Sequence, residues 1–254
     1  MINYIEVINT ALDAGTAILN FYSKPIKVER KEDNSPLTQA DLAAHDIIVN
    51  ALKRISPDVP IISEESRVPD YNERKEWNRF WLVDPLDGTK EFLKKNGEFT
   101  VNIALIENNV PVFGVVYIPA KNVTYFGELG KGSFKIENGK QKKIISKTPD
   151  LDKPVTVVSS RSHGSNDLEE KLSELGVTIG NNIAAGSSLK FCLVAEGSAD
   201  IYPRFGPTME WDTGAGDAVF RYSGEEVRYS PIRYNKESLL NEGFIIGLNG
   251  SVDK

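Results

Sequence analysis

The feature that most constrains this chain is an apolar segment, residues 80–83, that runs directly into two carboxylates. Asp84 and Asp87 follow it in a turn that Pro85 and Gly88 restrict. Carboxylates fixed at the end of a strand suit a hard cation such as Mg²⁺, which takes oxygen ligands in near-octahedral geometry. Backbone N–H groups at the start of a following helix would bind a phosphate beside that cation. A metal and a phosphate together indicate metal-assisted phosphoryl hydrolysis.

The bulk composition is that of an ordinary globular protein, with 254 residues, 40% hydrophobic and 26% charged. The length fits one large domain or two intimately packed halves. A net charge of −6 without a basic block argues against a nucleic-acid partner. The single cysteine, Cys192, excludes an internal disulfide and fits a reducing compartment.

No apolar run approaches the roughly 20 residues that span a bilayer, and the first helical pattern contains Asp13, unlike a signal peptide. We therefore predict a cytoplasmic protein without a transmembrane segment. Loose association with a membrane surface and a homodimer both stay open at this point.

Periodicity predicts a series of helices and short strands. Helices are expected at 3–22, 38–55, 167–175, 187–195 and 213–220, and strands at 59–63, 80–83, 101–106, 112–118, 123–126, 155–159 and 199–202. A polar, lysine-rich segment at 131–154 is expected to separate two halves, 1–140 and 141–254, of one compact functional unit. The order of elements predicts a layered α/β and α+β sandwich with alternating helix and sheet layers.

Four acidic sites stand at the ends of these elements: Asp41, Glu64 with Glu65, Asp84 with Asp87, and Asp212. Each has an ordinary interpretation. Asp41 fits a capping box, Asp212 an N-cap, Asp87 a plain turn and Glu64 a solvated loop. Together they favour a ligand site, because strand ends in α/β sheets collect such sites and crowded carboxylates repel one another unless a cation lies between them.

Several motifs resemble those of the inositol monophosphatase superfamily, and within it the CysQ-type 3′(2′),5′-bisphosphate nucleotidases. The superfamily signatures are EES at 64–66, DPLDGT at 84–89 and WDTGAG at 211–216. The subfamily stretches are SPLTQAD at 35–41, DGTKEF at 87–92, SRSH at 160–163, GSSLKFC at 186–192 and YPRFGP at 202–207. The resemblance runs from the first helix to about residue 220 and implies a Mg²⁺-dependent, lithium-sensitive phosphomonoesterase with the sugar-phosphatase fold.

The resemblance also implies a ligand set for two to three Mg²⁺ ions. Glu64, Asp84 and the backbone carbonyl of Leu86 would hold the first ion. Asp84, Asp87 and Asp212 would hold the second, and a weaker third ion would lie near Glu64.

The same resemblance assigns the catalytic and substrate-binding groups. Asp41 and Thr89 would polarise the attacking water, with Glu64 also in the catalytic set, and the N–H groups of Gly88 and Thr89 would bind the phosphate under attack. The residues implied to contact the nucleotide or its second phosphate are His163, Ser187, Lys190 and Arg204. Lys190 is also unusual in itself, because a lysine on an otherwise apolar helix needs a partner if it is buried.

The substrate indicated by the subfamily resemblance is adenosine 3′,5′-bisphosphate, hydrolysed at the 3′ position to AMP and phosphate. An inositol phosphatase or sugar-phosphate phosphatase on the same scaffold is the alternative, and it is favoured if Lys190 and Arg204 point away from the metals. A non-catalytic, cation-responsive protein is the third alternative. It would show a broken ligand set, whereas every position of the set is present here.

Overall fold

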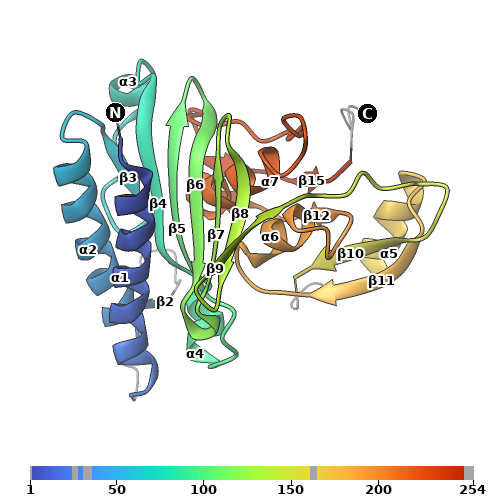
Figure 1. The fold of residues 1–254 in the computed structure, drawn as a ribbon, viewed down its shortest axis with the longest axis horizontal. Helices are drawn as coiled ribbons and strands as arrows, with labels where there is room; N and C mark the ends of the chain where they lie inside the picture. Colours follow the sequence, from blue (N-terminus) through green and yellow to red (C-terminus); the bar gives the residue numbers. More distant parts are fainter. Residues whose placement is uncertain (1, 25–27, 31–35, 161–164, 249–254) are drawn as a thin grey trace.

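The protein is built of alternating helix and sheet layers, seen edge-on in Figure 1. The computed structural model describes residues 2–24, 28–30, 36–160 and 165–248. Two long helices cover one face of a seven-stranded sheet, and two more helices cover the other face. A small parallel pair of strands with its own helix lies beyond them. This arrangement confirms the predicted layered sandwich.

The N-terminal part of the chain supplies the outer helices and most of the large sheet. Its elements are α1 (Tyr4–Tyr22), β1 (Val28–Arg30), β2 (Pro36–Thr38), α2 (Gln39–Ile55), β3 (Ile61–Ser63), α3 (Tyr71–Arg74), β4 (Arg79–Asp87), α4 (Thr89–Leu93), β5 (Thr100–Glu107), β6 (Val110–Ile118), the 3₁₀ helix η1 (Pro119–Lys121), β7 (Val123–Glu128), β8 (Gly132–Glu137) and β9 (Lys140–Ile144).

The C-terminal part supplies the inner helices and the outer strands. Its elements are β10 (Val155–Ser159), α5 (Ser165–Glu174), β11 (Ile179–Ala184), α6 (Leu189–Ala195), β12 (Tyr202–Arg204), β13 (Thr208–Met209), α7 (Glu210–Arg221), β14 (Leu240–Asn241) and β15 (Phe244–Ile246).

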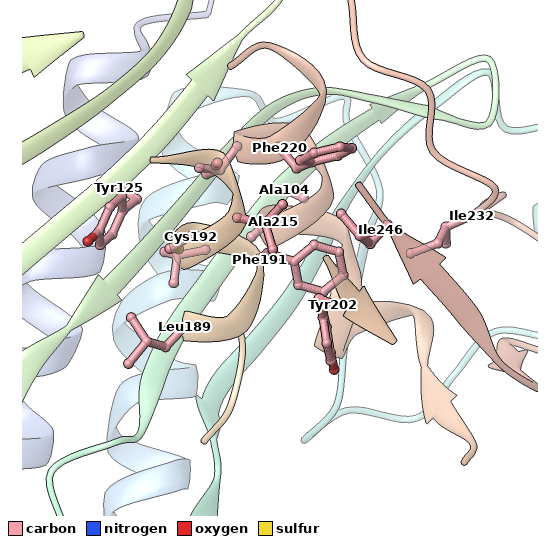
Figure 2. Close-up of a cluster of buried hydrophobic side chains, with 14 of the residues drawn as sticks. Ala104, Tyr125, Leu189, Phe191, Cys192, Tyr202, Ala215, Phe220, Ile232 and Ile246 are labelled. Atoms are coloured by element: carbon pink, nitrogen blue, oxygen red, sulfur yellow. The ribbon is translucent and has the colours of Figure 1, made fainter. Parts of the chain in front are cut away.

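The large sheet runs β3-β4-β5-β6-β7-β8-β9 and is antiparallel except for the parallel pair β3–β4. Its central strands are buried on both faces, which explains their continuous apolar sequences. On β4, Trp81 and Val83 face the core under α1 and α2, whereas Phe80 and Leu82 face the core under α6 and α7. Figure 2 shows part of this second core, including Phe191, Tyr202 and Ala215.

Helix α7 packs unusually close to the sheet because small residues line the contact. A Cβ atom added at Gly114 on β6 would lie 2.6 Å from the backbone oxygen of Ala215 and 2.7 Å from Cβ of Ala218. Only glycine permits this approach. The close packing brings the first turn of α7 to the sheet end where β4 finishes.

The expected helices and strands of the first half all form, with β4 extending to Asp87. The polar segment 131–154, which was expected to separate two halves, contains β8 and β9, because residues such as Phe134 pack against the core under α1 and α2. Two predicted bounds in the second part were wrong. The strand expected at 199–202 lies at 202–204, and the last long helix begins at Glu210 instead of Thr213. No helix among the described residues is both long and apolar enough to cross a membrane.

Candidate metal and phosphate site

The end of β4 carries the two carboxylates of the central motif. Asp84 pairs with Asn102 of β5 and Asp87 with Thr100, so the residues between the two carboxylates bulge out of the ladder. The N–H of Leu86 donates to Oδ1 of Asp84 at 3.0 Å and closes this turn. Proline fits here because a bulge needs no ladder hydrogen bond from it.

Glu64 reaches the same place from the neighbouring strand. β3 is parallel to β4, with Ser63 beside Val83, and the N–H of Glu64 donates to the carbonyl of Val83 at 3.1 Å. Parallel strands end at the same edge of the sheet, so Glu64 lies next to Asp84. The solvated-loop interpretation of Glu64 therefore does not describe its position.

Asp212 comes from the first turn of α7. Met209 is the N-cap residue, and its N–H donates to Oδ2 of Asp212 at 2.9 Å. Asp212 is therefore the third residue of the helix. The interpretation of Asp212 as an N-cap, which assumed a helix beginning at residue 213, was wrong. The capping bond fixes the side chain while leaving Oδ1 without a protein donor in the described contacts.

Electrostatics show that these carboxylates converge. Burial raises the pKa of Asp84 well above its usual range, and the charges of Glu64, Asp87 and Asp212 raise it further. Burial, followed by the charge of Asp87, raises the pKa of Asp212 to about 8. Crowded anions in a buried place are costly unless a cation neutralises them.

The donor set fits a hard divalent cation, because it consists of carboxylate and carbonyl oxygens without histidine or cysteine. As the side chains stand, no three His, Cys, Asp or Glu groups among the described residues are arranged to hold an ion. One oxygen each of Asp87 and Asp212 instead accepts hydrogen bonds from the protein. The chemistry of the site, rather than a closed cage, therefore supports a Mg²⁺ assignment.

Asp87 is held by donors that the sequence analysis missed. Its Oδ2 accepts from the N–H of Ser188 at 2.7 Å, from the Ser188 hydroxyl at 3.0 Å and from Nδ2 of Asn102 at 3.3 Å. Ser188 also lies 2.8 Å from the backbone oxygen of Asp212 and accepts from Asn102 at 2.8 Å. Ser188 thus links β4, β5, α6 and α7. A polar Asn102 inside an apolar strand was the available signal.

The predicted catalytic pair also comes together. Thr89 Oγ1 lies 3.3 Å from Oδ1 of Asp41, while the other oxygen of Asp41, Oδ2, accepts from the backbone and hydroxyl of Thr38 at 2.8 and 2.5 Å. The capping-box interpretation of Asp41 is confirmed. It is compatible with a second use of the same side chain, because the two oxygens have different partners.

Gly88 connects Asp87 to α4 in a left-handed conformation, with φ of +89°. A Cβ atom there would lie 2.2 Å from Oγ of Ser187. Both the backbone angle and the close approach exclude other residues. The Ser187 hydroxyl itself is directed at the backbone oxygens of Asp87 and Glu98, at 2.9 and 2.8 Å.

Three cations, Lys90, Lys190 and Arg204, line the same cavity as the carboxylates. The cavity has a volume of about 250 Å³, and Asp87, Asp212, Lys190 and Arg204 are all part of its wall. Lys190 is buried and donates to the backbone oxygen of Ser187 at 2.7 Å. Burial lowers its pKa to about 8, although Asp87 opposes this shift.

Arg204 is held in place by hydrogen bonds to its own loop. Its guanidinium donates to the backbone oxygens of Gly206 and Pro207 at 3.1 and 2.9 Å and to the hydroxyl of Ser160 at 3.2 Å. These partners are neutral, so the positive charge of Arg204 is available to an anion in the cavity.

The structure describes one of the two histidines of the chain. His163 lies outside the described residues. His45 lies one turn beyond Asp41 on α2, and its Nδ1 lies 2.9 Å from Oγ of Ser63, the residue before Glu64.

The layered fold and the carboxylate-lined cavity are those of a phosphatase. The chain belongs to the inositol monophosphatase family, whose model matches residues 3–246, and it is a phosphatase of that family. Members of the family are metal-dependent phosphatases that generally use Mg²⁺. The resemblance noted from the motifs is thereby confirmed.

Individual relatives are similar over almost the whole length. A 3′(2′),5′-bisphosphate nucleotidase CysQ from Escherichia coli K12 is 50% identical over 249 residues, covering 96% of this chain and 98% of that protein. Among solved structures, CysQ from Bacteroides thetaiotaomicron, described as a bacterial member of the inositol monophosphatase family, is 44% identical with a TM-score of 0.77 and covers 95% of each chain. The Thermotoga maritima IMPase is 26% identical with a TM-score of 0.70, covering 85% of this chain and 81% of that one.

Proposed function

We propose that this chain hydrolyses the 3′-phosphate of adenosine 3′,5′-bisphosphate to give AMP and phosphate. The observation that carries the proposal is that one cavity is lined both by the carboxylates Asp87 and Asp212 and by the cations Lys190 and Arg204. A substrate with two phosphates has an anion for each end of such a cavity, whereas a polyol monophosphate needs no second cationic site. The CysQ relatives, which carry the name of this activity, support the same substrate.

The proposed cofactor is two to three Mg²⁺ ions. Glu64, Asp84 and the carbonyl of Leu86 would hold one ion, Asp84, Asp87 and Asp212 a second, and a third would lie near Glu64. Bound Mg²⁺ would neutralise the charge on the phosphoryl oxygens and make the attacking water more acidic. The crowded carboxylates then stay ionised at neutral pH, because a nearby cation lowers their pKa.

Asp41 and Thr89 would orient the attacking water. The Thr89 hydroxyl can donate to Oδ1 of Asp41, so its lone pairs would accept a hydrogen bond from the attacking water. Asp41 is fixed for this role by the capping bonds to its other oxygen. The N–H groups of Gly88 and Thr89 would bind the phosphate under attack. No serine or cysteine nucleophile and no phospho-enzyme is required.

The second phosphate and the nucleoside would lie toward the C-terminal half. Lys190 and Arg204 would bind the phosphate, and His163 and Ser187 are proposed to contact the nucleotide or this phosphate. We propose that residues 1–140 supply most metal-binding groups, and that residues 141–254 supply Asp212 and the specificity groups. A cytoplasmic location and a homodimer remain predictions.

The proposal is tested by phosphate release with Mg²⁺ from equal concentrations of adenosine 3′,5′-bisphosphate, inositol 1-phosphate and fructose 1,6-bisphosphate, with and without lithium. We expect strong preference for the adenosine bisphosphate and inhibition by lithium. Preference for inositol 1-phosphate would keep the metal site and refute the role given to Lys190 and Arg204. Preference for fructose 1,6-bisphosphate would refute the adenosine substrate. No release from any substrate would favour a non-catalytic protein.

A further inference from the structure

Tyr202 is a cavity residue that begins the YPRFGP stretch at 202–207 but has no role in the metal site or in the proposed substrate contacts. It begins β12, which pairs antiparallel with β15, with Tyr202 opposite Ile246 and Arg204 opposite Phe244. Residues two apart on a strand point to the same face. Tyr202 and Arg204 therefore project together, and both line the cavity that contains Asp87 and Asp212.

The ring of Tyr202 is firmly held. The residue is only 4% exposed, and its ring packs edge-on against Phe191 and Phe244, with centroids 5.2 and 5.5 Å apart. Nζ of Lys190 lies 5.3 Å from the centroid of the ring. Figure 2 shows the ring at the border of the apolar cluster, with the hydroxyl directed away from it. A ring fixed in this way places its hydroxyl reproducibly.

The hydroxyl of Tyr202 makes no hydrogen bond within the described part of the chain, which sets it apart from the other buried tyrosines there. Those four donate to Asn122, Glu196, the backbone oxygen of Pro111 and Asp217, at 2.7 to 3.2 Å. The hydroxyls of buried tyrosines normally have a partner, and that of Tyr202 is not among the fully buried unpartnered atoms of the described residues, so it is accessible from the cavity that the residue lines. Burial raises the pKa of Tyr202, so its hydroxyl stays protonated and is a hydrogen-bond donor at any working pH.

We propose that Tyr202 is a specificity-determining residue whose hydroxyl donates a hydrogen bond to the phosphate that is not cleaved. The ammonium of Lys190 on one side and the guanidinium of Arg204 on the same strand face make this part of the cavity attractive to an anion. The phenol hydroxyl adds a neutral hydrogen-bond donor with a fixed direction. Such a donor helps the enzyme to discriminate between a substrate with a phosphate at this position and one with a hydroxyl group. This inference rests on the proposed function.

The test compares Tyr202→Phe with the wild type on two substrates that share the 3′-phosphate, adenosine 3′,5′-bisphosphate and 3′-AMP. The ring and its packing stay, so we expect the variant to fold. We expect kcat/KM for the bisphosphate to fall about tenfold, mainly through KM, which corresponds to about 1.4 kcal/mol. The value for 3′-AMP, which lacks the second phosphate, should change less than twofold.

Tyr125→Phe is the matched control, because Tyr125 is equally buried but donates to Glu196 and does not line this cavity. It should leave both substrates unchanged. Equal losses on both substrates by Tyr202→Phe, or a retained preference, would overturn the inference while the proposed function stands. A wild-type enzyme that does not prefer the bisphosphate over 3′-AMP would overturn the proposed function and the inference together.

Discussion

Removing the hydroxyl of Ser188 should weaken metal binding, although Ser188 is not itself in the predicted ligand set. The hydroxyl lies between Asp87, Asn102 and the backbone oxygen of Asp212, and it is almost fully buried. In Ser188→Ala the N–H of residue 188 still donates to Asp87, but Asn102 and the carbonyl of Asp212 each lose a partner. Unsatisfied buried polar groups cost about 1–3 kcal/mol.

The effect on function follows from the position of the lost hydroxyl. Groups that hold metal ligands in place change metal affinity by about 10- to 100-fold when they are removed. We therefore expect the Mg²⁺ concentration for half-maximal phosphate release to rise about tenfold or more. The assay is phosphate release from adenosine 3′,5′-bisphosphate over a Mg²⁺ titration, combined with urea unfolding to measure stability.

Ser133→Ala is the matched control for this experiment. Ser133 is also fully buried and donates to a backbone oxygen, that of Val219, at 2.6 Å, but it lies on β8 and does not contact the predicted ligands. It should lose a similar amount of stability and keep the wild-type Mg²⁺ dependence. If both variants show unchanged Mg²⁺ dependence, the argument that Ser188 positions Asp87 and Asp212 is refuted.

Three further predictions follow from the same site. Asp87→Asn should abolish turnover with little change in the unfolding midpoint, because the amide oxygen still accepts from Ser188 while the charge is lost; near-normal phosphate release would show that the two-metal assignment is wrong. Lys190→Ala should reduce kcat/KM for bisphosphates at least about tenfold more than for monophosphates, because a charge-assisted hydrogen bond is lost; similar losses on both would contradict its role. Burial lowers the pKa of His45 below its usual 6.5, so on acidification the unfolded chain takes up the proton first. The stability that neutral His45 contributes is therefore present above about pH 6.5 and is lost as the pH falls. In urea unfolding, His45→Gln should therefore lose less stability than the wild type between pH 8 and 5.5. Parallel losses would argue against a neutral histidine at this half-buried position.

The sequence alone predicted most of the fold where the pattern of side chains is strong. β5 and β6 are recognisable as continuous apolar runs, which are typical of strands buried on both faces. α1 and α2 are recognisable because their apolar residues recur at helical spacing on one face. β8 and β9 were missed because their side chains are mostly half-buried or exposed, so lysine and glutamate are tolerated there. Their identity as strands comes from pairing, of β8 with β7 and of β9 with β8, which the apolar pattern of each segment does not record.

The sequence also predicted which groups would carry the chemistry, because the carboxylates at the ends of short motifs can be identified one position at a time. What only the tertiary structure decided is how these groups meet. Asp212 reaches β4 because Gly114 lets α7 approach the sheet, and Tyr202 reaches the cavity because β12 pairs with β15. The contact of Ser188 and Asn102 with each other and with Asp87 could be recognised only in the structure, because the two residues are 86 positions apart in the sequence. Short motifs specify which functional groups are present. The distances between these groups and their burial, on which the function depends, are set by packing between remote parts of the chain.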